Sequence, residues 1–401
     1  MTTITTNNPF TSPFLNQLIL TPSLLPFSNE ELLDLDRDLN QYEQLFLDPD
    51  IEKNLLSKNE LLASFAISKA ENSTLTLQEA QDVYDFLLKN EDYSFISGKL
   101  KKGKKLLQKD YEKLEFFNIA KTFREYQEIQ IDEVTPDFIL QLHQKLTQGL
   151  DVFQTHLPHF DVYKSGKWRD NDNIRVGEYK PAPYHEIETG VQELVIWIQN
   201  NRAITSIGIF HTALYALHPF TNGNKRVSRI LEHIFLRSLG VNKKNLYSTS
   251  YYYHKEKARY YKYLLFSLER KNLNHFVGFF QEAFALSILS VVKTSLEVKR
   301  KAFLDSQNTD EQITRICKPL IKKHEVQFKN LFKNVNGKMA RQTFVTYLQQ
   351  ATDQKIVNRR EVGKTTFYSL NISPQEEGTF NTMLDFIKTK LTFIPDEIKL
   401  A

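Results

Sequence analysis

Two apolar segments with helical spacing, joined by a short polar loop, constrain this chain most strongly. Residues 204–217 are apolar at most positions and predict a buried helix, which Pro219 would end directly after His218. Apolar residues recur at helical spacing over 227–239, and Gly240 follows where a helix often ends. We therefore expect the chain to fold around two adjacent helices whose connecting loop is open to a ligand.

The start of the second helix concentrates groups that suit a polyphosphate. An exposed helix start offers unpaired N–H groups and the positive end of the helix dipole. Gly223 lets a ligand approach the backbone closely. Arg226 and Arg229 are three residues apart and share one helix face, and Lys225 adds a further positive charge. A base next to this site, His218, would be suited to activate a hydroxyl that attacks phosphorus.

The loop reads His-Pro-Phe-Thr-Asn-Gly-Asn-Lys-Arg over 218–226, with another arginine three residues on. This motif resembles HxFx(D/E)GN(G/K)R of the Fic/Doc superfamily. The resemblance implies a mainly α fold with an all-helical Fic core, and transfer of AMP from ATP to a Ser, Thr or Tyr hydroxyl of a target protein. It implies His218 as the catalytic base. The nucleotide and its phosphates would be bound by Gly223, Asn224, Lys225, Arg226 and Arg229.

Two residues depart from the adenylylating pattern. Asn222 stands where the family has Asp or Glu as a ligand of Mg²⁺, and a neutral amide oxygen is a weaker ligand for this ion. Lys225 replaces a glycine and resembles the Doc branch, whose members phosphorylate their target. A Doc-like protein kinase and an inactive Fic scaffold that binds nucleotide or DNA therefore remain alternatives. Adenylylation is favoured because Arg229 and the segment around Glu71 resemble the adenylylating branch.

The segment Ser-Lys-Ala-Glu-Asn-Ser-Thr-Leu-Thr over 68–76 is similar to the inhibitory-helix segment of many Fic proteins. The resemblance implies that an inhibitory helix over about 57–72 brings Glu71 to Arg229. Glu71 would then block the productive placement of the γ-phosphate of ATP. The physical reason is that a carboxylate satisfies an arginine in an empty phosphate pocket and repels a triphosphate that enters it.

Residues 166–182 change character, with Gly, Asp, Asn and Pro around short apolar stretches, and predict a β-hairpin. This hairpin resembles the Fic flap, which borders the active site and pairs with the backbone of the target. The resemblance places Gly177, Glu178, Tyr179 and Lys180 nearest the nucleotide or target. It also suggests Tyr260 and Tyr261 as a wall for adenine, although aromatic residues at helical spacing also form cores.

The remaining pattern suggests several regions: an N-terminal arm over 1–27, the Fic domain over 28–298, a polar linker over 299–312 and a further domain over 313–401. In the last region, a short helix at Arg341–Leu348 is followed by two strands around a Val-Gly-Lys turn. This order resembles that of a winged helix-turn-helix-like domain. The resemblance suggests DNA as a partner of this domain, or the formation of a homodimer.

The composition limits which partners and which cellular compartment are expected for the chain. The 401 residues carry a formal net charge of only +4, so overall charge does not point to nucleic acid. A single cysteine, Cys317, excludes a disulfide within the chain. The N-terminus lacks the pattern of a signal peptide, and no continuous run reaches the ~20 apolar residues of a membrane span. We expect a cytoplasmic protein with no membrane partner.

Overall fold

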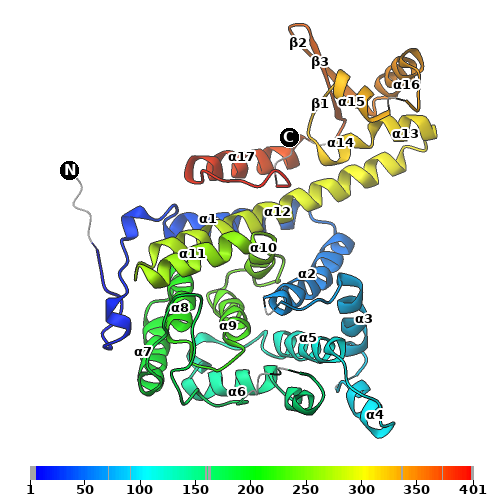
Figure 1. The fold of residues 1–401 in the computed structure, drawn as a ribbon. Coiled ribbons are helices and arrows are strands. Elements are labelled where there is room, and N and C mark those ends of the chain that lie inside the picture. Colours follow the sequence, from blue (N-terminus) through cyan, green and yellow to red (C-terminus); the bar gives the residue numbers. More distant parts are fainter. Residues whose placement is uncertain are drawn as a thin grey trace. The chain divides into compact units, whose positions relative to one another are not determined.

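The computed structural model describes residues 6–70, 72–90, 92–158, 160, 164–335, 337–372 and 374–398. The chain divides into two compact units. Unit 1 comprises Met1–Asp36 and Lys53–Ser287, and unit 2 comprises Arg37–Glu52 and Ile288–Ala401. Both units are mainly helical, which confirms the predicted fold class (Figure 1).

Most of the helices belong to unit 1. They are α2 (Pro49–Lys69), α3 (Leu77–Leu87), α4 (Phe95–Lys101), α5 (Gln108–Glu125), α6 (Pro136–Leu146), α7 (Ile187–Asn200), α8 (Ile204–Leu217), α9 (Asn224–Ser238), α10 (Thr249–Lys255) and α11 (Lys257–Glu269). Short 3-10 turns are η1 (Leu15–Gln17), η2 (Pro22–Leu24), η3 (Ile131–Glu133), η4 (Leu150–Thr155) and η5 (Tyr184–Glu186). Helices α1 (Asn29–Phe46) and α12 (Asn274–Ser306) each contribute residues to both units, as does α2, whose residues up to Glu52 belong to unit 2.

Helices α8 and α9 are the predicted central pair. They pack against each other, and α8 also contacts α7 and α11 (Figure 1). Nearly every residue of α8 is buried. A Cβ added at Gly208 would lie 2.8 Å from Cδ1 of Phe280, so this glycine lets α12 pack closely against α8. Gly240 has φ +77° just after α9, which confirms the predicted helix end.

Two sequence predictions differ from the structure. The described part of the predicted hairpin holds one isolated bridge, Val176 to Tyr179, and no longer strand. Carbonyls that a strand would use, those of Asn171 and Ala182, instead accept hydrogen bonds from Arg169. The predicted linker is helical as far as residue 306, because its first charged residues pair within unit 2.

Unit 2 contains the remaining elements. They are α13 (Glu311–Cys317), α14 (Pro319–Lys322), β1 (Val326–Gln327), α15 (Phe328–Val335), α16 (Arg341–Asp353), β2 (Val357–Val362), β3 (Thr365–Leu370) and α17 (Pro374–Lys390). The strands form an antiparallel sheet in the order β1-β3-β2, and β2 pairs with β3 from Val357–Leu370 to Val362–Thr365. The predicted helix at Arg341 and the two strands after it are therefore confirmed.

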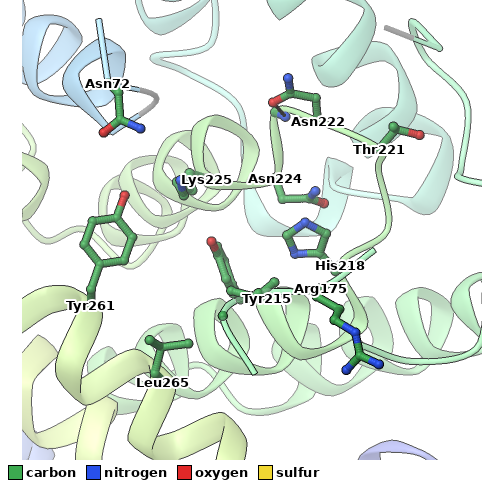
Figure 2. A pocket seen from close by; sticks show the side chains of 13 residues that line it. Asn72, Arg175, Tyr215, His218, Thr221, Asn222, Asn224, Lys225, Tyr261 and Leu265 are labelled. Carbon is green, nitrogen blue, oxygen red and sulfur yellow. Dashed lines mark hydrogen bonds between the residues drawn. The ribbon is translucent and has the colours of Figure 1, made fainter. Parts of the chain in front are cut away.

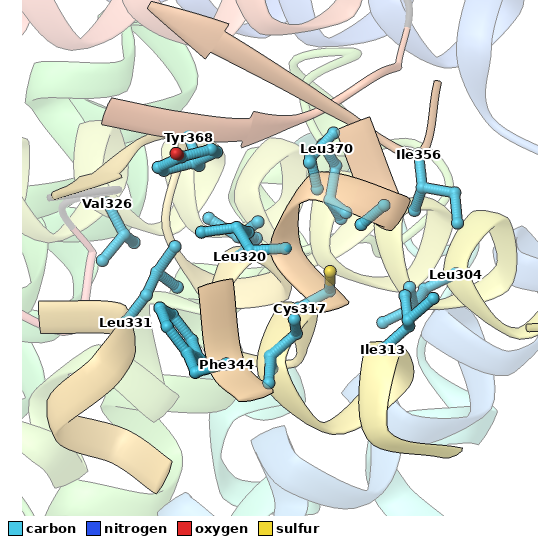
Figure 3. Packing of buried hydrophobic residues seen from close by; sticks show 14 of the residues in the cluster. Leu304, Ile313, Cys317, Leu320, Val326, Leu331, Phe344, Ile356, Tyr368 and Leu370 are labelled. Carbon is cyan, nitrogen blue, oxygen red and sulfur yellow. The ribbon is translucent and has the colours of Figure 1, made fainter. Parts of the chain in front are cut away.

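The core of unit 2 lies between its sheet and its helices. Figure 3 shows Leu320, Leu331, Phe344, Tyr368 and Leu370 converging in one cluster. The only cysteine, Cys317, is buried in the same cluster, where burial raises the pKa of its thiol to about 12. A thiol in this environment packs as a small apolar side chain.

One helix among the described residues, α12, is long and apolar enough to cross a membrane by length and composition. Its most apolar window is 83% buried inside the protein. That degree of burial is typical of a helix in the core of a folded domain.

Candidate functional site

A cavity of about 480 Å³ opens in unit 1 at the junction of α8 and α9. The described residues that line it come from the loop after α2, the predicted flap, the end of α8, the start of α9 and α11 (Figure 2). The lining residues are Asn72, Arg175, Val176, Gly177, Tyr215, His218, Thr221, Asn222, Gly223, Asn224, Lys225, Tyr261 and Leu265. His218 and the loop after it, which the sequence singled out, therefore lie in one cavity.

His218 caps the C-terminus of α8 in a left-handed conformation, with φ +49° and ψ +60°. The following Pro219 disfavours the right-handed helical conformation at this position. The N–H of His218 still donates to the carbonyl of Leu214 over 3.0 Å, so the helix ends in an ordered cap. Its ring meets that of Tyr215 edge to face at 5.3 Å, and Figure 2 shows it at the cavity beside Asn224.

The loop between the helices is closed by Asn224. Its amide oxygen accepts from the N–H of Phe220 over 2.9 Å, and its amide nitrogen donates to the carbonyl of the same residue over 2.7 Å. The first helical hydrogen bond of α9 runs from the N–H of Val227 to the carbonyl of Gly223. The N–H groups of 224–226 therefore precede the helical ladder, as a helix start that binds an anion requires.

His143 on α6 fastens the other side of this loop, and the sequence did not single it out. Its Nδ1 accepts from the N–H of Gly166 over 3.0 Å, and its Nε2 lies 3.0 Å from the carbonyl of Asn222. The ring stacks on Phe220 at 3.9 Å. Burial, and next the positive charge of Arg226, lower the pKa of His143 to about 4. His143 is therefore neutral near pH 7, with its Nε2 proton directed at the loop.

The arginines of the motif differ from Lys225 in their exposure. Arg226 is fully buried, and its Nη1 lies 2.8 Å from Oε1 of Glu115 on α5. Arg229 is also buried, whereas Lys225 is partly exposed and lines the cavity. Of the three predicted phosphate-binding cations, only Lys225 thus faces the cavity in this structure.

Two aromatic rings pack against Arg229, and one of them is bound to a buried carboxylate. Its guanidinium lies 4.6 Å from the ring centre of Tyr260 and 5.3 Å from that of Tyr253. The hydroxyl of Tyr253 donates to Glu232 over 3.1 Å, and Glu232 lies 2.8 Å from Nδ1 of His211. Tyr260 is fully buried and does not line the cavity, whereas its neighbour Tyr261 does.

The C-terminal end of α2 lies against these cations. Nη1 of Arg229 donates to the carbonyl of Ala66 over 3.1 Å. Nζ of Lys225 and the hydroxyl of Tyr261 both donate to the carbonyl of Ala70, over 3.3 and 3.0 Å. The next residue, Glu71, lies outside the described residues, so its pairing with Arg229 stays a prediction.

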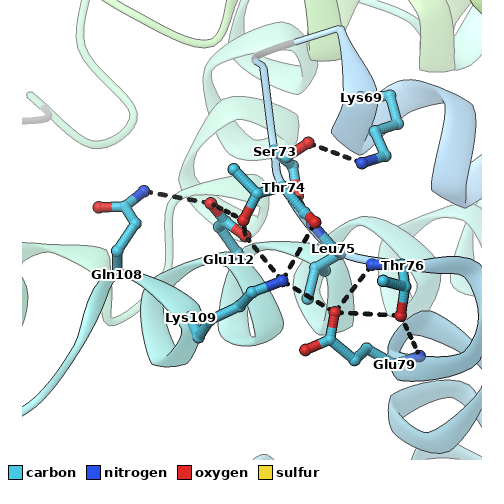
Figure 4. Close-up of polar contacts among 9 residues, drawn as sticks. All are labelled: Lys69, Ser73, Thr74, Leu75, Thr76, Glu79, Gln108, Lys109 and Glu112. Carbon is cyan, nitrogen blue, oxygen red and sulfur yellow. Dashed lines mark hydrogen bonds and ion pairs between the residues drawn. The ribbon is translucent and has the colours of Figure 1, made fainter.

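The segment that follows α2 is anchored to α3 and α5 (Figure 4). The hydroxyl of Thr74 donates to Glu112 over 2.8 Å. Thr76 and Glu79 form a reciprocal capping box at the start of α3. Nζ of Lys109 joins the two contacts, since it lies 2.8 Å from Glu79 and donates to the carbonyl of Thr74. These contacts fix the described residues on the far side of position 71.

The predicted flap contributes part of the cavity wall. Val176 and Gly177 line the cavity, together with Arg175 before them. The other predicted flap residues, Glu178, Tyr179 and Lys180, do not line it. The hydroxyl of Tyr179 donates to the carbonyl of Ala216 over 3.3 Å, which ties the tip of the flap to α8.

The described residues offer few ligands for Mg²⁺. Within the described ranges, no group of three or more His, Cys, Asp or Glu side chains could hold a metal ion. The amide oxygen of Asn222 accepts from the N–H of Gly223 over 2.7 Å, and no described residue of the cavity wall carries a carboxylate. These residues do not fit a magnesium site held by the protein.

Comparisons with known proteins agree with the motif. Residues 133–236 match the model of the Fic/DOC family. A probable protein adenylyltransferase of Aquifex aeolicus is 27% identical over 176 residues, which cover 40% of this chain and 51% of that protein. Protein adenylyltransferase fic-1 of Caenorhabditis elegans is 26% identical over 132 residues, which cover 32% of this chain and 23% of that protein. The chain thus spans about half of the first relative and about a quarter of the second.

Among solved structures, a Fic family protein from Desulfovibrio desulfuricans is similar with a TM-score of 0.49 and 18% identity. The match covers 88% of this chain and 99% of that one. A Fic domain containing signaling protein from Bacteroides thetaiotaomicron gives a TM-score of 0.44, also at 18% identity, and the match covers 66% of this chain and 98% of that one.

Proposed function

With a Fic/DOC family domain at residues 133–236, we propose that this chain is a protein adenylyltransferase that uses ATP. The observation that carries the proposal is that His218 and the open start of α9 line the same cavity. His218 takes the proton of a Ser, Thr or Tyr hydroxyl, and the hydroxyl oxygen attacks the α-phosphorus of ATP. A new P–O bond forms, the bond to the bridging oxygen of the β-phosphate breaks, and pyrophosphate leaves.

The start of α9 supplies the electrostatic stabilisation. The N–H groups of 224–226 and the positive end of the helix dipole face the phosphates, where negative charge develops. Lys225 places a positive charge at the same wall of the cavity. Asn224, whose side chain binds Phe220, keeps the loop in the shape that presents these groups.

We propose that the end of α2 inhibits the enzyme in the conformation seen in this structure. Arg229 is suited to the γ-phosphate, but its Nη1 donates to the carbonyl of Ala66. Lys225 and Tyr261 hold the carbonyl of Ala70 in the same way. Helix carbonyls at a C-terminus carry partial negative charge and compete with phosphate oxygens for these groups. A bound triphosphate would have to displace this end of α2, and Glu71 would add to the repulsion.

The flap is the proposed site for the target. Its exposed residues from Asp172 to Lys180 border the cavity at Arg175 and Gly177. An extended segment of a target that pairs with the flap backbone would bring its hydroxyl toward His218. Such pairing reads little sequence, so the identity of the target depends on contacts outside this cavity.

Labelled ATP tests the reaction. The chain is incubated with ATP carrying label in the α-phosphate or, separately, in the γ-phosphate, with a protein extract as the source of targets. Adenylylation predicts label on protein from the α-phosphate only. Label from the γ-phosphate only would instead establish the Doc-like kinase that Lys225 suggests, and no label would favour the inactive scaffold that Asn222 suggests. His218→Ala should abolish transfer, whereas His185→Ala, an exposed histidine outside the cavity, should not.

Unit 2 supports a second candidate function, the binding of double-stranded DNA. Its order of α14, β1, α15, α16, β2 and β3 resembles that of a winged helix. Helix α16 carries no acidic side chain before Asp353, and its exposed face can donate and accept hydrogen bonds with base edges. The exposed polar residues of this face are Arg341, Gln342, Thr343, Thr346, Gln349 and Gln350, and the apolar Val345 is exposed among them.

Fluorescence anisotropy with a labelled duplex of mixed sequence tests this function. Binding should weaken steeply with salt, and Arg341→Gln should weaken it further, whereas Lys388→Gln on α17 should not. Salt-independent anisotropy would exclude contact with the phosphate backbone. A homodimer and a cytoplasmic location stay predictions.

A further inference from the structure

We propose that Arg169, in the predicted flap, is a positioning residue that holds His218 in its reactive conformation. Arg169 does not line the cavity, and its side chain is only 1% exposed, so it acts through the main chain of its neighbours. The role in catalysis rests on the proposed function, but the contacts themselves do not. The sequence analysis did not single out this arginine.

One guanidinium and its own backbone bind three successive carbonyls at the end of α8. Nε of Arg169 donates to the carbonyl of His218 over 2.8 Å, and Nη2 donates to that of Leu217 over 3.2 Å. The main-chain N–H of Arg169 donates to the carbonyl of Pro219 over 2.9 Å. The whole turn around His218 is therefore fixed by a single residue that lies 49 positions earlier in the chain.

The other edge of the same guanidinium closes the flap. Nη1 donates to the carbonyl of Asn171 over 2.6 Å and lies 3.2 Å from Oδ1 of Asp172. Nη2 also donates to the carbonyl of Ala182. Asp172 accepts the N–H of Tyr184 over 2.7 Å as well. Arg169 thus joins both ends of the flap to the turn that carries the base.

This clamp opposes a backbone conformation that is unfavourable by itself. A left-handed conformation is unfavourable for a residue other than glycine, and His218 has φ +49°. Buried hydrogen bonds from a charged donor are stronger than those between neutral groups. The positive charge also lies at the negative end of the α8 dipole. Without Arg169, the turn loses the contacts that outweigh its strain, and the imidazole leaves its place beside the cavity.

A second anchor of the loop is independent of this clamp. His143 binds the carbonyl of Asn222, and Asn224 binds the main chain of Phe220. Loss of Arg169 should therefore disturb residues 217–219 and leave the start of α9 in place. The expected kinetic result is a lower rate at saturating ATP with little change in the affinity for nucleotide.

The test uses the full chain with Arg169→Gln, Arg169→Lys and, as a matched control, Lys167→Gln. Lys167 is an exposed cation two residues away, and it lies before the segment from Asp172 to Lys180 that is proposed to bind the target. We expect Arg169→Gln to lower kcat for self-modification by about 100-fold, because misplacing a reacting group by ~1 Å costs on that order. The KM for ATP should stay within about twofold of the wild-type value, because the variant removes no contact that binds the substrate and the transition state equally. Arg169→Lys should recover part of kcat, and Lys167→Gln should match wild type.

Hydrogen exchange gives a readout that does not need the proposed reaction. Peptides covering 214–222 should exchange faster in Arg169→Gln, whereas those covering 227–238 should not. Slower transfer, together with weaker binding of ADP and faster exchange throughout the chain, would show an ordinary folding defect and overturn the proposal. Unchanged kcat in an active protein would overturn it as well. If wild type transfers no label, the proposed function fails, and faster local exchange would still support the clamp while unchanged exchange would refute it.

Discussion

The buried ion pair between Arg226 and Glu115 allows a quantitative prediction. Their side chains are 0% and 2% exposed, and Nη1 lies 2.8 Å from Oε1. Tyr111 also donates to this carboxylate, over 2.9 Å. Glu115→Gln keeps the shape of the side chain but removes its charge. Breaking a buried pair by neutralising one partner typically costs about 3–5 kcal/mol, since the remaining charge has left water without full compensation.

The expected consequence is a lower melting temperature of unit 1. At roughly 2–3 °C per kcal/mol for a domain of this size, the loss amounts to roughly 6–15 °C. Differential scanning calorimetry measures it, and the two units are fitted as separate transitions. Glu125→Gln on the same helix is the matched control. Its carboxylate is 35% exposed and pairs with Lys145, and such surface pairs contribute about 0–1 kcal/mol.

A Glu115→Gln protein that melts within about 1 °C of the Glu125→Gln control would refute this reasoning. It would mean that Arg226 does not depend on the charge of Glu115. Arg226 would then be available to a phosphate without disturbing the fold, and the structural part of its role would have to be abandoned.

Three further predictions concern regulation, metal and pH. Glu71→Gly should increase self-modification by freeing Arg229; unchanged modification with wild-type ATP affinity would argue against inhibition. Asn222→Asp should raise Mg²⁺-dependent transfer, measured in a magnesium titration, because it restores a carboxylate at the loop; an unchanged titration would exclude that explanation. Burial holds the pKa of His143 near 4 against an ordinary 6.5, so the unfolded state binds its proton first as pH falls. Stability should drop by about 3 kcal/mol between pH 6.5 and 4, and urea unfolding of His143→Gln should show a flatter profile.

The central helices could be predicted because their signals are local. Apolar spacing, Pro219 and Gly240 fix α8, α9 and the loop between them without reference to the rest of the chain. The motif loop likewise lies in one cavity, since its residues are consecutive. Local patterns of this kind predict a site well when a single turn carries it.

The residues that support the loop could not be predicted in this way. Glu115, His143 and Arg169 come from α5, α6 and the flap, and each looks like an ordinary polar residue in its own segment. Their partners are set by tertiary packing. The aromatic pair shows the same limit, because spacing alone did not separate the cavity residue Tyr261 from the buried Tyr260.

The predictions of a hairpin at the flap and of a linker after residue 298 were wrong for a related reason. Turn-forming residues predicted a hairpin, but Arg169 in the same segment, which is bound to the end of α8, takes carbonyls that a strand ladder would need. Charged residues after 298 suggested a linker, but Lys299 and Arg300 pair with Glu376 and Glu377 and continue the helix. In both segments, contacts made far along the chain override the local preference.

Intact-mass spectrometry of the purified chain after incubation with ATP and Mg²⁺ shows directly whether the chain transfers AMP and whether the transfer needs His218. Wild type, Glu71→Gly and the double variant Glu71→Gly/His218→Ala are compared. We expect a mass increase of one AMP that is largest in Glu71→Gly and absent from the double variant. An increase of one phosphate, or an AMP adduct that persists without His218, would contradict it.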